Sequence, residues 1–156
     1  MTYKLKRRAM VFGAGAALGI STLMASTALA AEPIKFGVVA HLTGPLAGGE
    51  AVTHTPNIEF WANQVNARGG LKVDGEMRPV EIITYDDKTN PAEHIKAVQR
   101  LATQDEVDFM LSPYGTGFNI AAAPIYAKYN YPLVAVSAIT DQIPTLTKRF
   151  PNMFFT

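Results

Sequence analysis

The sequence has 156 residues, 48% of them hydrophobic, which is enough for one domain with a buried core. It contains no cysteine, which excludes disulfides and cysteine-ligated metal sites. The formal net charge is +1, but four of the 14 basic residues and none of the acidic residues precede residue 31. The remainder therefore carries 10 basic and 13 acidic side chains, a net charge of −3, and lacks the basic excess that nucleic-acid binding requires.

Residues 1–30 have the pattern of a cleavable export signal. Basic residues lie between Lys4 and Arg8, an apolar segment follows from Ala9 to about Ile20, and Ala28-Leu29-Ala30 supplies a small–x–small cleavage pattern. The apolar segment is short for a membrane span of roughly 20 residues, which disfavours a membrane anchor. We therefore expect cleavage near Ala30 after export by the Sec or the twin-arginine route.

The mature chain, 31–156, begins with an apolar run over 34–40 that predicts a strand. The Gly- and Pro-containing segment 41–50 follows it and predicts a loop. Segment 57–67 predicts a helix because its apolar residues recur on one face, and Gly69-Gly70 ends that helix. The residues of this face are Ile58, Trp61, Ala62 and Val65.

A charged hairpin or turn is expected over 72–78, before a second strand over 80–85. The next helix has a strong start signal: Asn90 can cap it, Pro91 suits the first helical position, and Glu93 completes a capping box. Its apolar stripe is expected to consist of Ile95, Val98, Leu101 and Ala102.

A third strand is expected over 107–111, followed after a loop by a helix that runs to about Lys128. Leu133 to Val136 predicts a fourth strand, 142–147 one or two helical turns, and 153–155 the start of a fifth strand. Apolar strands that alternate with helices indicate the α/β class, with a parallel sheet covered by helices on both faces.

In such a sheet, ligands bind beyond the carboxyl ends of the strands, where the strand-to-helix loops lie. The loop after the third strand, 112–117, points main-chain N–H groups and hydroxyls at one spot, which suits a carboxylate. There Ser112 and Thr116 can donate hydrogen bonds, Gly115 permits close approach, and Tyr114 offers a flat apolar wall. The loop after the fourth strand, which begins at Ser137, is also small and polar.

Five motifs in order resemble the periplasmic binding proteins of branched-chain amino-acid ABC transporters. They cover nearly all of the mature chain and are Thr43-Gly44-Pro45, Asn66-Ala67-Arg68-Gly69-Gly70, Tyr85-Asp86-Asp87, Ala122-Ala123-Pro124-Ile125-Tyr126 and Ser137-Ala138-Ile139-Thr140. The resemblance implies that 31–156 is the incomplete first lobe of a two-lobed type I periplasmic binding protein. It also implies a periplasmic protein without catalysis, cofactor or metal, which binds a solute between its lobes and docks on a membrane permease.

The resemblance also assigns roles to individual residues. The family Ser/Thr that holds the ligand carboxylate matches Thr116, and the backbone carbonyl and Thr side chain after the fourth strand match Ala138 and Thr140. Gly115 and Ser137 belong to the same two loops. An aromatic residue that is frequent in the family's first loop is replaced by Gly48, so Tyr114 and Phe118 suggest an aromatic or larger carboxylate as an alternative to an amino acid.

Other interpretations of the sequence compete with this one. Asp86-Asp87 is expected to cap and brace its loop rather than to hold a metal. His41, His54 and His94 fit no zinc motif; His94 is expected in an exposed helical turn, while the other two flank the first loop. A nucleotide-dependent enzyme is disfavoured because the first loop has no phosphate-binding glycine pattern. The remaining alternative is the same clamp serving as the sensor module of a signalling receptor.

Overall fold

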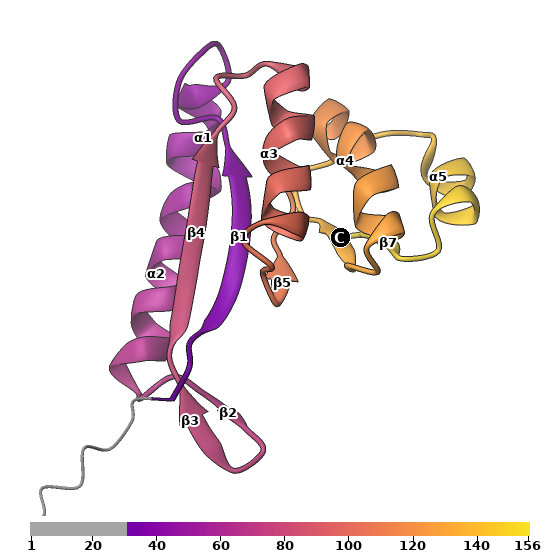
Figure 1. Ribbon diagram of the computed structural model, residues 1–156. Coiled ribbons are helices and arrows are strands. Elements are labelled where there is room, and N and C mark those ends of the chain that lie inside the picture. Colours follow the sequence, from indigo (N-terminus) through magenta and orange to yellow (C-terminus); the bar gives the residue numbers. More distant parts are fainter. Residues whose placement is uncertain (1–30) are drawn as a thin grey trace, which may run out of the picture.

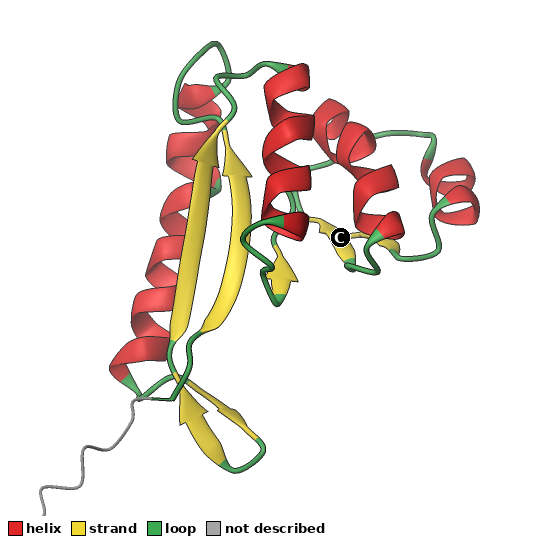
Figure 2. Cartoon of the chain, viewed as in Figure 1, coloured by secondary structure: helices red, strands yellow, loops and turns green. Residues whose placement is uncertain are grey.

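The computed structural model describes residues 31–156, so the export signal predicted for 1–30 lies outside the described residues (Figures 1 and 2). Strands and helices alternate along most of the chain, as expected. The elements are β1 (Ile34–Ala40), α1 (Ala47–Thr53), α2 (Thr55–Ala67), β2 (Leu71–Val73), β3 (Glu76–Arg78), β4 (Val80–Asp86), α3 (Pro91–Thr103), β5 (Phe109–Met110), α4 (Thr116–Lys128), β6 (Leu133–Ala135), α5 (Ile143–Arg149) and β7 (Met153–Phe155).

The strands of the core pair in parallel, which confirms the predicted fold class. β1 lies between β4 and β5, and it pairs with β4 from Ile34–Val80 to Ala40–Asp86. β6 and β7 form a separate parallel pair, whereas β2 and β3 form the predicted charged hairpin. Figure 1 shows this hairpin projecting beyond one end of the β1–β4 pair.

The expected single sheet is therefore divided between β5 and β6, and β5 is shorter than the predicted strand over 107–111. Tyrosine hydroxyls donate hydrogen bonds to the main-chain carbonyl groups at the two ends of segment 107–111. Tyr131 donates to the Val107 carbonyl at 2.6 Å, and Tyr126 donates to the Leu111 carbonyl at 2.6 Å. These acceptors are satisfied without pairing to β6.

Helices cover both faces of the three-stranded sheet. Side chains of successive residues in β1 point to opposite faces. The ring of Phe36 packs edge-on against Trp61 of α2, with centroids 5.1 Å apart, while Leu101 of α3 lies against Gly37. α4 packs against α3 and β6, and the larger buried cluster lies between these helices and the sheet. Figure 2 shows α2 and α3 on opposite sides of β1 and β4.

The segment predicted as the loop 41–50 ends in the short helix α1, so that prediction was wrong for its second half. Gly48 and Gly49 disfavour a helix by local propensity. The side chain of Glu50 supplies a contact between helices, because its Oε1 accepts from Thr55 Oγ1 at 2.7 Å and lies 3.0 Å from His54 Nδ1. These contacts join α1 to the start of α2.

The start of α3 confirms Asn90 as the cap, since Asn90 Oδ1 accepts from the N–H groups of Ala92 at 2.8 Å and Glu93 at 3.2 Å. The predicted capping box was wrong: the Glu93 carboxylate binds Lys96 Nζ at 2.8 Å, and the Asn90 N–H donates to the Asp87 carbonyl at 2.9 Å instead. Val98 and Leu101 are buried as predicted, but His94, expected to be exposed, is completely buried.

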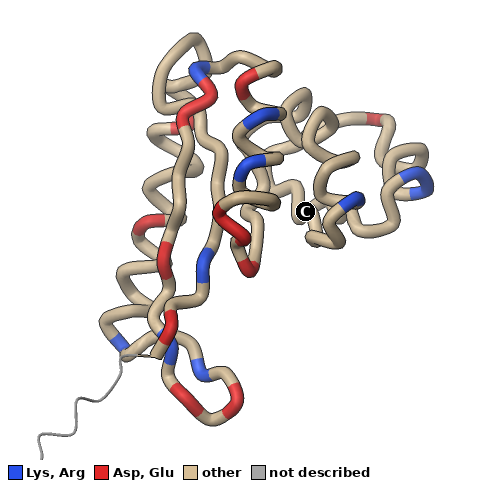
Figure 3. Tube along the Cα trace, viewed as in Figure 1, with Lys and Arg blue, Asp and Glu red and all other residues tan. Residues whose placement is uncertain are grey.

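Along residues 31–156, Lys and Arg are interspersed with Asp and Glu (Figure 3). No helix in this part of the chain has the length and apolar character needed to span a membrane.

Candidate functional site

Two loops at the carboxyl edge of the strands, β5–α4 and β6–α5, are joined by side-chain hydroxyls. Ser137 Oγ accepts from the Gly115 N–H at 3.0 Å and donates to the Pro113 carbonyl at 3.3 Å. Thr116 Oγ1 accepts from the Ile139 N–H at 2.9 Å and donates to the Ile139 carbonyl at 3.2 Å. The structure thus brings Gly115, Thr116 and Ser137 together, as their place on one sheet edge predicted.

Helix α4 begins at this junction of the two loops. Gly115 precedes the helix with φ of +88°, and no side chain caps the first turn. The first N–H groups of a helix lack intrahelical partners and lie at the positive end of its dipole. Asn119 braces the loop from inside, because its amide donates to Pro113 at 2.8 Å and Gly115 at 2.9 Å. This arrangement can accept a carboxylate.

The remaining predicted residues of the β6–α5 loop have different surroundings. Ala138 is buried, and Ile139 beside it is 92% exposed. Thr140 Oγ1 accepts from the Gln142 N–H at 3.2 Å, so this hydroxyl also braces the approach to α5. Ser112 is buried and lines a groove between α2 and the sheet. It lies apart from the hydrogen bonds that Ser137 and Thr116 make between the two loops.

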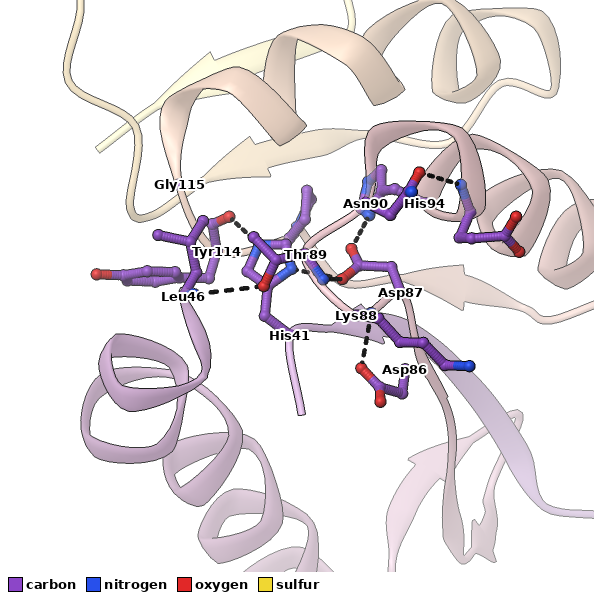
Figure 4. Close-up of polar contacts among 12 residues, drawn as sticks. His41, Leu46, Asp86, Asp87, Lys88, Thr89, Asn90, His94, Tyr114 and Gly115 are labelled. Carbon is purple, nitrogen blue, oxygen red and sulfur yellow. Dashed lines mark hydrogen bonds and ion pairs between the residues drawn. The ribbon is translucent and has the colours of Figure 1, made fainter. Parts of the chain in front are cut away.

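The Tyr114 ring lies against α1 at Gly49. A Cβ atom at Gly49 would lie 2.5 Å from the Tyr114 hydroxyl, so the glycine gives this ring room. Figure 4 shows the ring projecting away from His41 and Asp87. Phe118 does not join Tyr114 in one wall; its ring packs against His41 and His94, with centroid distances of 4.2 and 5.0 Å.

A buried polar network links the first three strand-to-helix loops. Asp87 Oδ1 lies 2.6 Å from His41 Nδ1, and Asp87 Oδ2 lies 2.7 Å from His94 Nδ1. His41 Nε2 in turn lies 3.0 Å from the Tyr114 carbonyl oxygen (Figure 4). Sequence reasoning missed this network, although His41, His94 and the acidic pair after the second strand were its visible signal.

The two adjacent aspartates brace the β4–α3 loop, as the sequence predicted. Asp86 accepts from Thr43 Oγ1 at 2.7 Å and from the Lys88 N–H at 2.9 Å, and Asp87 Oδ1 accepts from the Thr89 N–H at 2.8 Å. Lys88 and Thr89 both have φ of +58°, a conformation that non-glycine residues seldom adopt. These side-chain acceptors stabilise the turn.

The buried side chains of His94 and Glu50 have shifted pKa values. Burial lowers the pKa of the His94 imidazole, and the opposing hydrogen bond to Asp87 does not restore it. Burial acts to raise the pKa of Glu50, but hydrogen bonds with His54 and Thr55 together outweigh it, so that this pKa lies below its usual value. At neutral pH, His94 is uncharged and Glu50 is a carboxylate.

Both shifts predict that the protein loses stability in acid. Because His94 has a folded pKa below its usual 6.5, its contribution is complete above pH 6.5 and declines as the pH falls. Glu50 adds a second decline below its usual 4.5. In urea unfolding of the full-length protein between pH 7 and 5, we expect His94→Gln to flatten the decline, which one such group limits to about 1.4 kcal/mol per pH unit. Glu93→Gln, at an exposed position of the same helix, is the control; equal slopes in both variants would contradict the assignment.

A sequence profile described as periplasmic binding protein matches residues 33–156. The chain belongs to the periplasmic binding proteins. Within them it is of the type I, branched-chain amino-acid type, as individual relatives indicate. It is 28% identical over 141 residues to Leu/Ile/Val-binding protein homolog 6 of Brucella abortus, an alignment that covers 90% of this chain and 34% of that protein.

Solved structures of periplasmic binding proteins agree with this assignment. The substrate-binding protein LivJ of Streptococcus pneumoniae, in complex with isoleucine, has 28% identity and a TM-score of 0.69 over 80% of this chain and 33% of that one. A solute-binding protein of Rhodopseudomonas palustris, in complex with 4-hydroxybenzoate, has 26% identity and a TM-score of 0.60 over 80% and 31%. The chain thus spans about a third of the length of these relatives, which are ABC transporter substrate-binding proteins.

Proposed function

We propose that this chain forms part of the solute-binding component of an ABC importer and binds a small carboxylated solute. The observation that carries the proposal is the uncapped amino terminus of α4, which opens where Ser137 and Thr116 join two loops at the carboxyl edge of the strands. The solute carboxylate would bind the first N–H groups of α4 and accept the hydrogen bond of the Thr116 hydroxyl, which the free protein donates to the Ile139 carbonyl, with contacts from Ala138 and Thr140.

The chemistry of the neighbours' ligands supports a carboxylate. Isoleucine and 4-hydroxybenzoate, the ligands of the two solved neighbours, share a carboxylate and differ in the rest of the molecule. In this chain Tyr114 provides an aromatic wall beside Gly49, where a larger residue would displace it. The solute is therefore an amino acid or an aromatic or aliphatic carboxylate.

We further propose that residues 31–156 are the incomplete first lobe of a two-lobed clamp. A groove of about 610 Å³ lies beside α2 and is lined by Phe36, Trp61, Phe109 and Val134, among others. Phe109 and Val134 are 47% and 44% exposed in the described chain. Monomeric proteins seldom expose large apolar patches to solvent. Because the relatives are about three times as long as this chain, we expect a later part of the full-length protein to cover this face.

In this proposal the protein acts in the periplasm, after cleavage of residues 1–30 near Ala30. The clamp closes on the solute and delivers it to the membrane permease of the transporter. Neither step requires catalysis by the protein.

The test is a binding panel on the full-length protein by isothermal titration calorimetry. It comprises L-leucine, L-isoleucine, 4-hydroxybenzoate and, as a matched control without a carboxylate, L-leucinamide. At least one of the acids should bind, and leucinamide should bind at least about tenfold more weakly than leucine if leucine is a ligand, because the α4 terminus would lose its anionic partner. Equal binding of leucine and leucinamide, or no binding by any acid, would contradict the proposal.

A further inference from the structure

Three titratable side chains, His41, Asp87 and His94, have no exposed surface and contact one another at the carboxyl ends of β1 and β4 (Figure 4). Asp87 lies between the imidazoles, at 2.6 Å from His41 Nδ1 and 2.7 Å from His94 Nδ1. None of them is among the residues that the proposed function places on the solute. A buried cluster of this kind has to satisfy each donor and acceptor internally.

The hydrogen bonds of His41 fix where its protons lie. Its Nε2 faces the Tyr114 carbonyl oxygen at 3.0 Å, and a carbonyl only accepts, so this nitrogen carries a proton. Its Nδ1 faces Asp87 Oδ1, which already accepts from the Thr89 N–H at 2.8 Å. A neutral imidazole has one N–H, so a second proton must lie between Nδ1 and Oδ1.

His94 does not supply that proton. Its Nδ1 lies 2.7 Å from Asp87 Oδ2, and its Nε2 is buried without a hydrogen-bond partner in the described chain, so the one proton of a neutral ring belongs on Nδ1, facing the carboxylate. An unpaired lone pair there costs less than an unpaired N–H cation, so His94 is the neutral member of the cluster. The extra proton therefore belongs to His41 and Asp87 together.

The cluster acts on the loop that precedes α4. The Tyr114 carbonyl, which accepts from His41, belongs to the peptide group whose N–H is that of Gly115, and this N–H donates to Ser137 Oγ at 3.0 Å. One peptide group is thus held on one side by His41 and on the other by the β6–α5 loop. It lies directly before the first turn of α4.

We propose that His41 and Asp87 share one proton, form a net neutral pair, and thereby position the Tyr114–Gly115 peptide for solute binding. They are positioning residues for the proposed site and do not contact the solute. This inference rests on the proposed function for its biological consequence, but the shared proton and the held peptide are properties of the protein without solute.

The surroundings of His41 explain why the shared proton matters. The groups that face His41 are Asp87, His94, Tyr114 and Glu50, whose carboxyl interacts with the His41 main-chain N–H. With only one N–H for its two acceptors, His41 would leave either the Tyr114 carbonyl or Asp87 without a donor. The shared proton therefore holds the peptide before α4.

The first experiment reads the protons of the histidine rings directly in the full-length protein without solute. Long-range ¹H–¹⁵N spectra at pH 7.5 should give His41 two protonated ring nitrogens and His94 one. An unprotonated ring nitrogen on His41 would overturn the inference. Because no solute is added, this result does not depend on whether the proposed function is correct.

The second experiment compares Asp87→Asn with Asp86→Asn, in which the adjacent carboxylate that binds Thr43 is changed instead. The amide of Asn cannot hold the shared proton, so His41 should lose one ring proton in Asp87→Asn, and hydrogen exchange of the Gly115 N–H should accelerate about tenfold. Asp86→Asn should leave both unchanged. Equal Gly115 exchange in the two variants would contradict the positioning role.

If Asp87→Asn does not fold, the ring spectra of the wild-type protein still decide whether the proton is shared. Two protonated ring nitrogens on His41 support the inference, and one unprotonated nitrogen overturns it. Where both variants fold, binding of the acid identified in the panel tests the link to function. Weaker binding in Asp87→Asn alone supports it, and unchanged binding in a variant with accelerated Gly115 exchange contradicts it.

Discussion

Gly70→Ala is expected to destabilise the full-length protein by more than about 3 kcal/mol, the range reached by backbone strain together with overpacking. Gly70 has φ of +102°, and a Cβ atom there would overlap the main-chain carbonyl of Arg78 and lie 2.9 Å from the nitrogen of Pro79. No rotation of a side chain can relieve this contact, because both partners are backbone.

The position of Gly70 in the fold explains why the backbone cannot move aside. Its N–H donates to the Val65 carbonyl at 3.0 Å and ends α2. Nearby, the Asn66 amide donates to the Val80 carbonyl at 2.8 Å and accepts from the Val80 N–H at 2.7 Å, which fixes the end of α2 to the start of β4. Displacement of residue 70 would disturb this connection between helix and sheet.

The matched control is Gly75→Ala in the β2–β3 turn. Gly75 has φ of +92°, but a Cβ atom there would meet nothing within 4 Å, so this variant carries the cost of the backbone conformation alone, roughly 1 kcal/mol. Urea unfolding of both variants measures the difference. Equal free energies of unfolding for the two variants would refute the steric argument.

Thr116→Val is expected to weaken binding of the solute identified in the acid panel by about 1–3 kcal/mol, which is roughly 5- to 150-fold. Valine has nearly the shape of threonine but no hydroxyl. The change removes the proposed hydrogen bond to the carboxylate and also the hydrogen bonds that Thr116 makes with the Ile139 main chain. The free protein should lose about 1 kcal/mol of stability, since these bonds are partly exposed.

Thr116→Ser separates the hydroxyl from the methyl group. Serine retains a donor and an acceptor at the same place, so it should restore most of the affinity and keep the β5–α4 and β6–α5 loops joined. Calorimetric titration of the three proteins with the same acid decides the question. Wild-type affinity in Thr116→Val would remove Thr116 from the solute site and leave it only a role in joining the loops.

The sequence by itself determined the features that depend on neighbouring residues. Apolar runs defined the strands, helical spacing placed Val98 and Leu101 in the core, and Asn90 identified the start of α3. The parallel sheet followed from the alternation of strands and helices. These signals are local, because periodicity and capping connect residues only a few positions apart.

Only the tertiary structure decided how the loops meet. His41 contacts Asp87 across 46 positions and Tyr114 across 73, and Thr116 binds Ile139 across 23. Local propensity also failed to predict α1, which the contacts of Glu50 stabilise despite two glycines. It failed to predict the burial of His94, whose ring contacts Asp87. Burial and hydrogen-bond satisfaction are determined by which residues meet in three dimensions. A pattern along the chain could therefore mark the edge of the sheet where we propose the solute site, but not the contacts between the loops.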